Sequence, residues 1–218
     1  EALALTLRAT AVTDLEKLDR SADLYLLAVS DSALEELASR LKLGQKIIAH
    51  TAGAVPMNLL SCASKNYGVF YPLQSIRKET GDQSKIPFLI DGNTAETKTI
   101  LSDLARNLSD SVYPAGDDLR SRLHLAAVIL NNFSNFLSSL ARDYCEGEKA
   151  DFEWLLPLVD ESARRLHFLD PRQLQTGPAR RHDHSTLEKH REQLASYPEL
   201  QEVYAFLSEK IMNYYPRG

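Results

Sequence analysis

The sequence predicts an α/β domain with a mostly parallel sheet, followed by an all-helical domain. Apolar runs alternate with helical patterns through the first half of the 218-residue chain. These runs are continuous, as expected for parallel strands that are buried on both faces of a sheet. From Asp117 onward only helical patterns occur. The chain is long enough for two small domains, which we place at residues 1–113 and 114–218.

The strands of the first domain are predicted at four apolar runs, Leu24–Val29, Lys46–Thr51, Tyr67–Tyr71 and Pro87–Ile90. Capping-box patterns, in which two backbone donors are satisfied reciprocally, indicate helix starts at Thr13-x-x-Glu16 and Ser32-x-x-Glu35. Pro56 stands where a first helical residue is expected, and Thr94 can cap the next helix. The polar segment Ser75–Lys85 is typical of a loop.

The second domain is predicted to contain four helices. Apolar residues recur every 3.6 positions over Asp117–Arg142. A second helix covers Asp151–Leu169, and Pro157 either kinks it or marks its true start. The pattern Ser185-x-x-Glu188 is a further capping box that opens the third helix, and Pro198 opens the last.

Composition narrows the class of protein. A net charge of −5 argues against a nucleic-acid partner, which needs basic surface. Cys62 and Cys145 form no CxxC pair, which favours a reducing compartment. No apolar run is long enough to span a membrane and no signal peptide is visible, so we expect a cytoplasmic protein. Residues Glu1–Leu7 resemble the second half of a helix, and we expect a further segment before them.

Two turns that follow predicted strands are candidates for cofactor binding. Val29, Ser30 and Asp31 follow the first strand, where polar groups and a helix N-terminus can meet a ligand. After the second strand come the small residues Thr51, Ala52, Gly53 and Ala54. They allow a flat ring to approach the backbone, and Gly53 can adopt a conformation closed to other residues. Plain helix capping and a tight strand-to-helix turn are the alternatives.

A polar set on the helix Asp117–Arg142 is the candidate catalytic group. At helical spacing His124, Asn131 and Asn135 share one face, with Asn132 beside it. A histidine exchanges a proton near neutral pH, and an asparagine can orient a carbonyl or hydroxyl group. A solvent-facing polar edge or a structural hydrogen-bond network is the alternative interpretation.

The irregular segment Gln175–Asp183 is the last candidate. Arg180 and Arg181 suit a phosphate or carboxylate. The cluster His182–His184 lacks the ligand spacing of known metal sites, so we predict no metal. The chain also lacks GxGxxG, the P-loop motif and GxSxG.

With these segments in order, the chain resembles a family of bacterial Rossmann-like oxidoreductases that carry a C-terminal helical domain of unknown function. This family is related to the deazaflavin-dependent NADP oxidoreductases and to the 6-phosphogluconate dehydrogenase and pyrroline-carboxylate reductase groups. The match rests on Ala28–Asp31, His50–Pro56, Gly68–Gln74, His124–Ala127 with Asn131–Phe133, and Gln175–Arg180. In two places the chain departs from the family pattern. Thr51–Ala54 lacks two hydroxyl groups, and His182 replaces a glycine.

The resemblance implies an NADP- or NAD-binding first domain and a helical domain that forms a homodimer. It also implies a preceding segment of roughly 35 to 45 residues that holds the glycine loop. Our leading hypothesis is an NAD(P)-dependent oxidoreductase acting on a small molecule in the cleft between the domains. In it His124, Asn131 and Asn132 are catalytic, and the substrate contacts Pro72, Gln74, Asn135 and Arg180. The alternatives are a non-catalytic dinucleotide sensor and a structural dimer.

Overall fold

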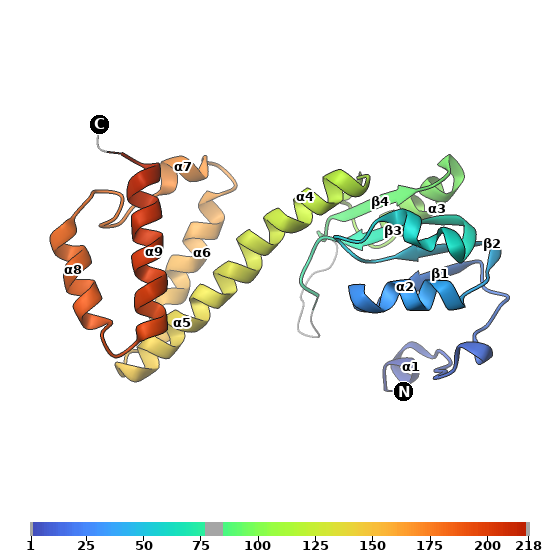
Figure 1. Cartoon of the computed structure of the whole chain (residues 1–218), viewed down its shortest axis with the longest axis horizontal. Coiled ribbons are helices and arrows are strands. Elements are labelled where there is room, and N and C mark those ends of the chain that lie inside the picture. Colours follow the sequence, from blue (N-terminus) through green and yellow to red (C-terminus); the bar gives the residue numbers. More distant parts are fainter. Residues whose placement is uncertain (1, 77–84, 217–218) are drawn as a thin grey trace. The chain divides into compact units, whose positions relative to one another are not determined.

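The computed structural model describes residues 2–76 and 85–216. The chain divides into two compact units, Glu1–Leu130 and Asn131–Gly218 (Figure 1). This division falls beyond the predicted boundary at residue 113, because helix α4 (Asp117–Ala127) belongs to the first unit. Leu123 of α4 packs against a buried cluster of the sheet that includes Val69 and Leu89. The α/β pattern therefore ends before the first unit does.

The first unit is built on a five-stranded sheet in the order β1-β2-β3-β4-β5. The strands β1, β2 and β3 are parallel, β4 runs antiparallel to β3, and β5 is parallel to β4. Their bounds are Leu24–Leu27, Gly44–His50, Ser64–Pro72, Phe88–Gly92 and Val112–Pro114. The predicted mostly parallel sheet is confirmed, and the short β5 is an addition to the prediction. Residues 77–84 of the predicted loop Ser75–Lys85 lie outside the described residues.

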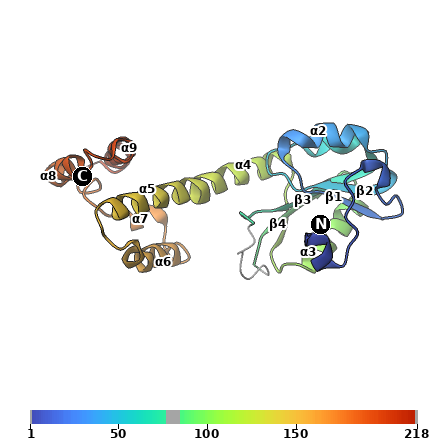
Figure 2. The ribbon, with the colours of Figure 1, turned by 90° about the horizontal axis from the view of Figure 1, so that it is seen from below.

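Helices cover both faces of this sheet, and Figure 2 shows α2 (Asp31–Arg40) and α3 (Ala95–Arg106) on opposite sides. On one face, α2 and the 3-10 helix η2 (Met57–Cys62) pack against β1 and β2. On the other, Leu101 and Ala105 of α3 pack against Phe70 and Ile90. Burial on both faces is the physical reason that the strand sequences are continuously apolar. A short helix α1 (Ala2–Leu7) and the 3-10 helix η1 (Leu15–Lys17) precede β1.

Several helix starts differ from the sequence prediction. Thr94 caps α3 as predicted, accepting a hydrogen bond from the Thr97 backbone N–H at 3.1 Å. The three capping boxes are wrong, because other residues occupy the cap positions. Asp14 caps η1, Ser30 precedes α2, and Asp183 caps α8 (His184–Gln193). The Asp14 and Asp183 carboxylates accept backbone N–H groups where hydroxyl groups had been expected to do so.

The second unit is helical, as predicted. It comprises α5 (Ser134–Gly147), η4 (Phe152–Leu155), α6 (Leu156–Arg165), α7 (Pro171–Leu174), α8 and α9 (Pro198–Tyr214). Pro157 lies in the first turn of α6 and so marks its start rather than a kink. Pro198 opens α9 as predicted. Within the described part of this unit, the buried apolar residues are few, namely Leu140, Cys145, Ala179, Leu187 and Leu194.

Candidate functional site

The two predicted cofactor segments meet at the carboxyl ends of β1 and β2. The Thr51 backbone N–H donates to the Leu27 carbonyl at 3.2 Å, which places the start of segment Thr51–Ala54 beside the end of β1. Ser30 is the N-cap residue of α2, but its side chain makes no capping hydrogen bond. Its hydroxyl instead lies 3.3 Å from the Ser32 hydroxyl. A polar turn and a helix N-terminus therefore share one edge of the sheet, as the sequence predicted for a ligand site.

Gly53 is required by a close contact rather than by its backbone conformation. A Cβ atom at this position would lie 2.5 Å from His124 Nδ1 and 2.7 Å from Cγ. Among the described glycines, positive φ occurs at Gly44 and Gly177 and not at Gly53, so that part of the prediction is wrong. A flat ring does approach the backbone here, and it is the imidazole of His124.

His124 is held on its Nδ1 side by Tyr71 as well. The Tyr71 hydroxyl lies 3.0 Å from His124 Nδ1, and the two rings meet edge to face at 6.0 Å. Tyr71 lies at the end of β3 and is buried, and this burial raises the pKa of its hydroxyl, helped by the negative charge of Asp31. Tyr71 is not among the site residues predicted from the sequence. Its position at the end of the third parallel strand was the available signal.

His50, the last residue of β2, is fully buried beneath the same turn. Its Nδ1 accepts a hydrogen bond from the Ala52 backbone N–H at 3.2 Å. Burial lowers the pKa of His50 to about 4, and the positive charge of Arg120 acts in the same direction. His50 is therefore neutral at pH 7, with its proton on Nε2. Because it is neutral and inside the turn, it supports the backbone shape of the segment that holds Gly53.

Arg120 of α4 forms hydrogen bonds with the turn that contains Gly53. Its side chain is 1% exposed, and its Nε donates to the Gly53 carbonyl at 3.2 Å. Its Nη2 donates to the Val55 carbonyl and, at 2.8 Å, to the Asp117 carboxylate. Asp117 in turn accepts the Met57 backbone N–H at 3.1 Å. Residues at i, i+3 and i+7 of α4 therefore face one turn, and the third of them is His124.

The other predicted residues are not brought into this cluster by any described contact. Asn131 and Asn132 lie in a π-helical turn, Val128–Phe133, which interrupts the single helix that was predicted. A π turn holds more residues than an α turn, and the shared face expected for His124, Asn131 and Asn135 on one regular helix stays a prediction. Asn131, Asn132 and Asn135 are all exposed.

The remaining predicted contacts have local partners. Pro72 ends β3, and the Gln74 side chain accepts the Ser75 backbone N–H at 3.1 Å. In the second unit, the Arg180 guanidinium stacks over the Tyr215 ring at 4.9 Å. The segment around Arg180 is irregular, as predicted, with Gly177 at a φ of 97°. Arg180 therefore has a structural contact, and its predicted role toward a substrate stays a prediction.

Within residues 2–76 and 85–216, no three His, Cys, Asp or Glu side chains are arranged to hold a metal ion. Over the same ranges, none of the helices is both long and apolar enough to cross a membrane.

The fold and this edge of the sheet define a Rossmann-like α/β protein with a helical C-terminal unit. Residues 86–211 match the family model described as "Domain of unknown function (DUF2520)", and the chain belongs to that family. The resemblance stated from the sequence is thereby confirmed. No protein with curated annotation matches the chain.

Several solved structures share this fold. A candidate NADP oxidoreductase of Bacteroides fragilis is 38% identical, with a TM-score of 0.92 over 97% of this chain and 83% of that one. A Thermotoga maritima protein is 22% identical, with a TM-score of 0.71 over 97% and 84%. An imine reductase from Myxococcus stipitatus in complex with NADP+ is 12% identical, with a TM-score of 0.65 over 97% and 82%. The last two likenesses concern the fold alone.

Proposed function

We propose that this protein is an NAD(P)-dependent oxidoreductase that transfers a hydride to or from a small molecule. One observation carries the proposal. The imidazole of His124 lies against the backbone of Gly53 at the carboxyl edge of parallel strands, and imidazole is a common proton-handling group in enzymes. The name of the Bacteroides fragilis relative, at 38% identity, points to the same class of reaction.

NADP or NAD is the cofactor in this proposal. The hydroxyl of Ser30 and the carboxylate of Asp31 suit the hydroxyl groups of a ribose, and Thr51, Ala52, Gly53 and Ala54 supply small side chains beside them. The Ser30 side chain is not used as a helix cap, and its hydroxyl, 3.3 Å from that of Ser32, is exposed at this turn. When bound, the nicotinamide would supply or accept the hydride. Val29, which precedes Ser30, is the remaining residue proposed to contact the cofactor.

The chain's own residues then handle the proton. His124 holds a proton at a ring nitrogen toward the substrate, and Arg120 keeps the Gly53 carbonyl in place through a hydrogen bond of 3.2 Å. Pro72 and Gln74, which follow Tyr71 at the end of β3, remain candidates for contact with the substrate. The roles assigned to Asn131, Asn132 and Asn135 stay predictions that substitution to alanine would test.

A thermal-shift titration with NADPH, NADH, NADP+ and NAD+ is the first test. A ligand at a hundred times its dissociation constant stabilises the folded state by about 2.7 kcal/mol. We expect a shift with at least one of the four, and no shift with any of them would refute the proposal. Binding without turnover on a panel of aldehydes, imines and hydroxy acids would instead identify a non-catalytic sensor.

A second test addresses His124 directly. On any substrate that the panel identifies, the His124→Ala variant should lose at least a hundredfold in kcat, the lower end of the usual contribution of acid–base catalysis. His167→Ala is the matched control, because His167 is exposed in the second unit. Equal turnover of the His124 variant and the wild type would remove His124 from the mechanism.

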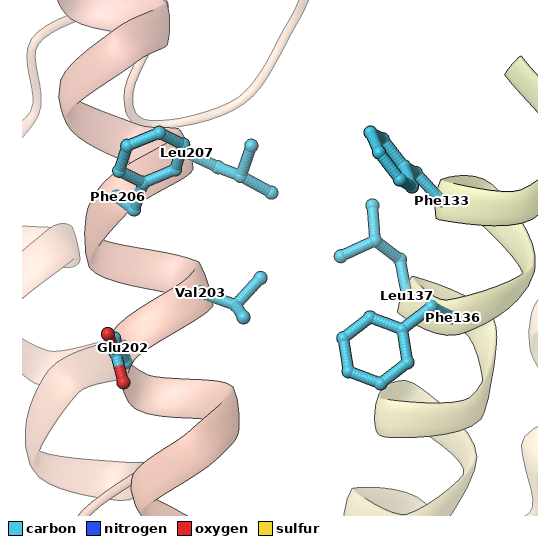
Figure 3. A pocket seen from close by; sticks show the side chains of 7 residues that line it. All are labelled: Phe133, Phe136, Leu137, Glu202, Val203, Phe206 and Leu207. Atoms are coloured by element: carbon cyan, nitrogen blue, oxygen red, sulfur yellow. The ribbon is translucent and has the colours of Figure 1, made fainter. Parts of the chain in front are cut away.

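The second unit carries a large apolar surface, for which we propose a second copy of this chain as the partner. Val203 and Leu207 of α9 point toward Phe133, Phe136 and Leu137 across an apolar pocket of about 360 Å³ (Figure 3). Phe133 is 58% exposed. The three buried hydrophobic clusters within the described residues all belong to the first unit. A helical unit with so small a core gains stability by pairing its apolar face with an identical one.

Light scattering after size exclusion tests the homodimer. We expect the wild type at twice the 24.4 kDa mass of one chain. Phe206→Glu places a charge beside the pocket and should shift the protein to a monomer. Leu5→Glu is the control, since Leu5 is 80% exposed in the first unit. A monomeric wild type at micromolar concentration would overturn the proposed dimer.

A further inference from the structure

The hydrogen bond of the His124 ring lies at Nδ1. The Tyr71 hydroxyl is 3.0 Å from Nδ1, and Nδ1 and Cγ face the backbone of Gly53. Within residues 2–76 and 85–216, the other ring nitrogen, Nε2, makes no hydrogen bond. His124 is partly buried, and Nε2 is the ring nitrogen whose hydrogen-bonding capacity is left for a ligand. The direction of the hydrogen bond at Nδ1 therefore decides what Nε2 presents.

The proton of the Tyr71 hydroxyl favours one direction for this hydrogen bond. Tyr71 is 9% exposed, and burial with the nearby negative charge of Asp31 raises its pKa, so the phenol keeps its proton at neutral pH. His124 Nδ1 is the acceptor that the described residues offer to this proton. If Nδ1 were protonated and donated to the phenol oxygen, a buried hydroxyl proton would lose its acceptor. Leaving a buried donor unsatisfied costs more than a typical hydrogen bond contributes.

We propose that Tyr71 is a positioning residue that donates to His124 Nδ1 and so holds the neutral imidazole with its proton on Nε2. His124 then presents an N–H donor to the ligand. A donor suits the oxygen of a carbonyl or the nitrogen of an imine, because that atom becomes negative when a hydride reaches the neighbouring carbon. The Nε2–H group stabilises this charge as a hydrogen-bond donor, and a proton from solvent completes the reduction, so the imidazole stays neutral. The inference rests on the proposed oxidoreductase function for this consequence, and it points to reduction of such a group.

The tautomer can be measured without any substrate. In protein labelled with ¹⁵N at histidine, the His124 signals are assigned from their loss in His124→Gln and recorded at a pH where the ring is neutral. We expect the proton on Nε2, and an Nδ1 resonance that moves when Tyr71→Phe removes the donor. Tyr113→Phe is the matched control, because Tyr113 is 54% exposed in the same unit. The backbone amide spectrum of each variant confirms that it folds.

The possible failures are distinguishable. A proton on Nδ1, or an Nδ1 resonance that Tyr71→Phe leaves unchanged, would overturn the role of Tyr71 and leave the proposed function standing. Absence of both cofactor binding and turnover would overturn the proposed function, and the role in reduction with it. On an identified substrate, Tyr71→Phe should lower kcat about five- to tenfold, as expected for one hydrogen bond, with little change in KM. Equal kcat in Tyr71→Phe and Tyr113→Phe would contradict the proposal.

Discussion

Protonation of His50 should destabilise the first unit as the pH falls. In the folded chain this side chain is fully buried, and its pKa is lowered to about 4 by burial first and by Arg120 second. Asp117 and Asp31 act in the opposite direction without restoring the normal value of 6.5. A charged imidazole here would lie without solvent beside a buried guanidinium, and folding therefore favours the neutral ring.

The size and sign of the effect follow from linkage. Between pH 6.5 and about 4, the unfolded chain binds a proton at His50 that the folded chain does not. The free energy of unfolding therefore falls as the pH decreases through this range, and it is unaffected by His50 above it. Each pKa unit corresponds to 1.36 kcal/mol, so the full loss is about 3 kcal/mol.

Hydrogen exchange at the amides of β2 and β3 measures this loss in the first unit alone. Protection factors at pH 7, 6, 5 and 4.5 give the free energy of opening after correction for intrinsic exchange rates. His50→Asn is the matched variant, since its amide oxygen can accept the Ala52 N–H yet does not titrate. The reasoning is refuted if wild type and variant lose protection in parallel as the pH falls.

Further predictions concern stability, measured by urea unfolding. Gly53→Ala should cost about 1–3 kcal/mol through the clash with His124, and adding His124→Ala should recover most of it. Arg120→Met leaves the Gly53 and Val55 carbonyls without their hydrogen-bond donor and should lower the free energy of unfolding by about 2–4 kcal/mol. Arg106→Met, at an exposed ion pair, should change that free energy little. Thr94→Ala removes the cap of α3 and should cost about 1 kcal/mol. An unchanged unfolding midpoint in Gly53→Ala or in Arg120→Met would contradict the contact assigned to that residue.

Much of the fold was accessible from the sequence because its signals are local. The continuous apolar runs predicted the four longer strands, and the switch to helical periodicity predicted the second unit. Strand β5 was missed because it is three residues long and ends at a proline. The capping-box predictions were wrong for a different reason. A Ser/Thr-x-x-Glu pattern is compatible with a helix cap, but neighbouring residues occupy the cap positions in the structure.

The candidate site shows the limit of the same reasoning. Gly53 and His124 were predicted separately as site residues, and no pattern along the chain indicates that they are in contact. Arg120 and Tyr71 were passed over, since a charged residue on a helix usually faces solvent and a strand tyrosine usually packs in the core. Their roles depend on contacts between residues that are far apart in the chain.

The sequence by itself determined the order of strands and helices, the mostly parallel sheet and the family of the chain. These features depend on apolar periodicity and short motifs, which are formed by residues close together in the sequence. Only the tertiary structure decided that α4 belongs with the sheet and that His124 lies between Gly53 and Tyr71. The physical reason is that burial and hydrogen bonding join side chains across turns of the fold. The close contact with His124 that requires glycine at position 53 cannot be predicted from the residues next to Gly53 in the sequence.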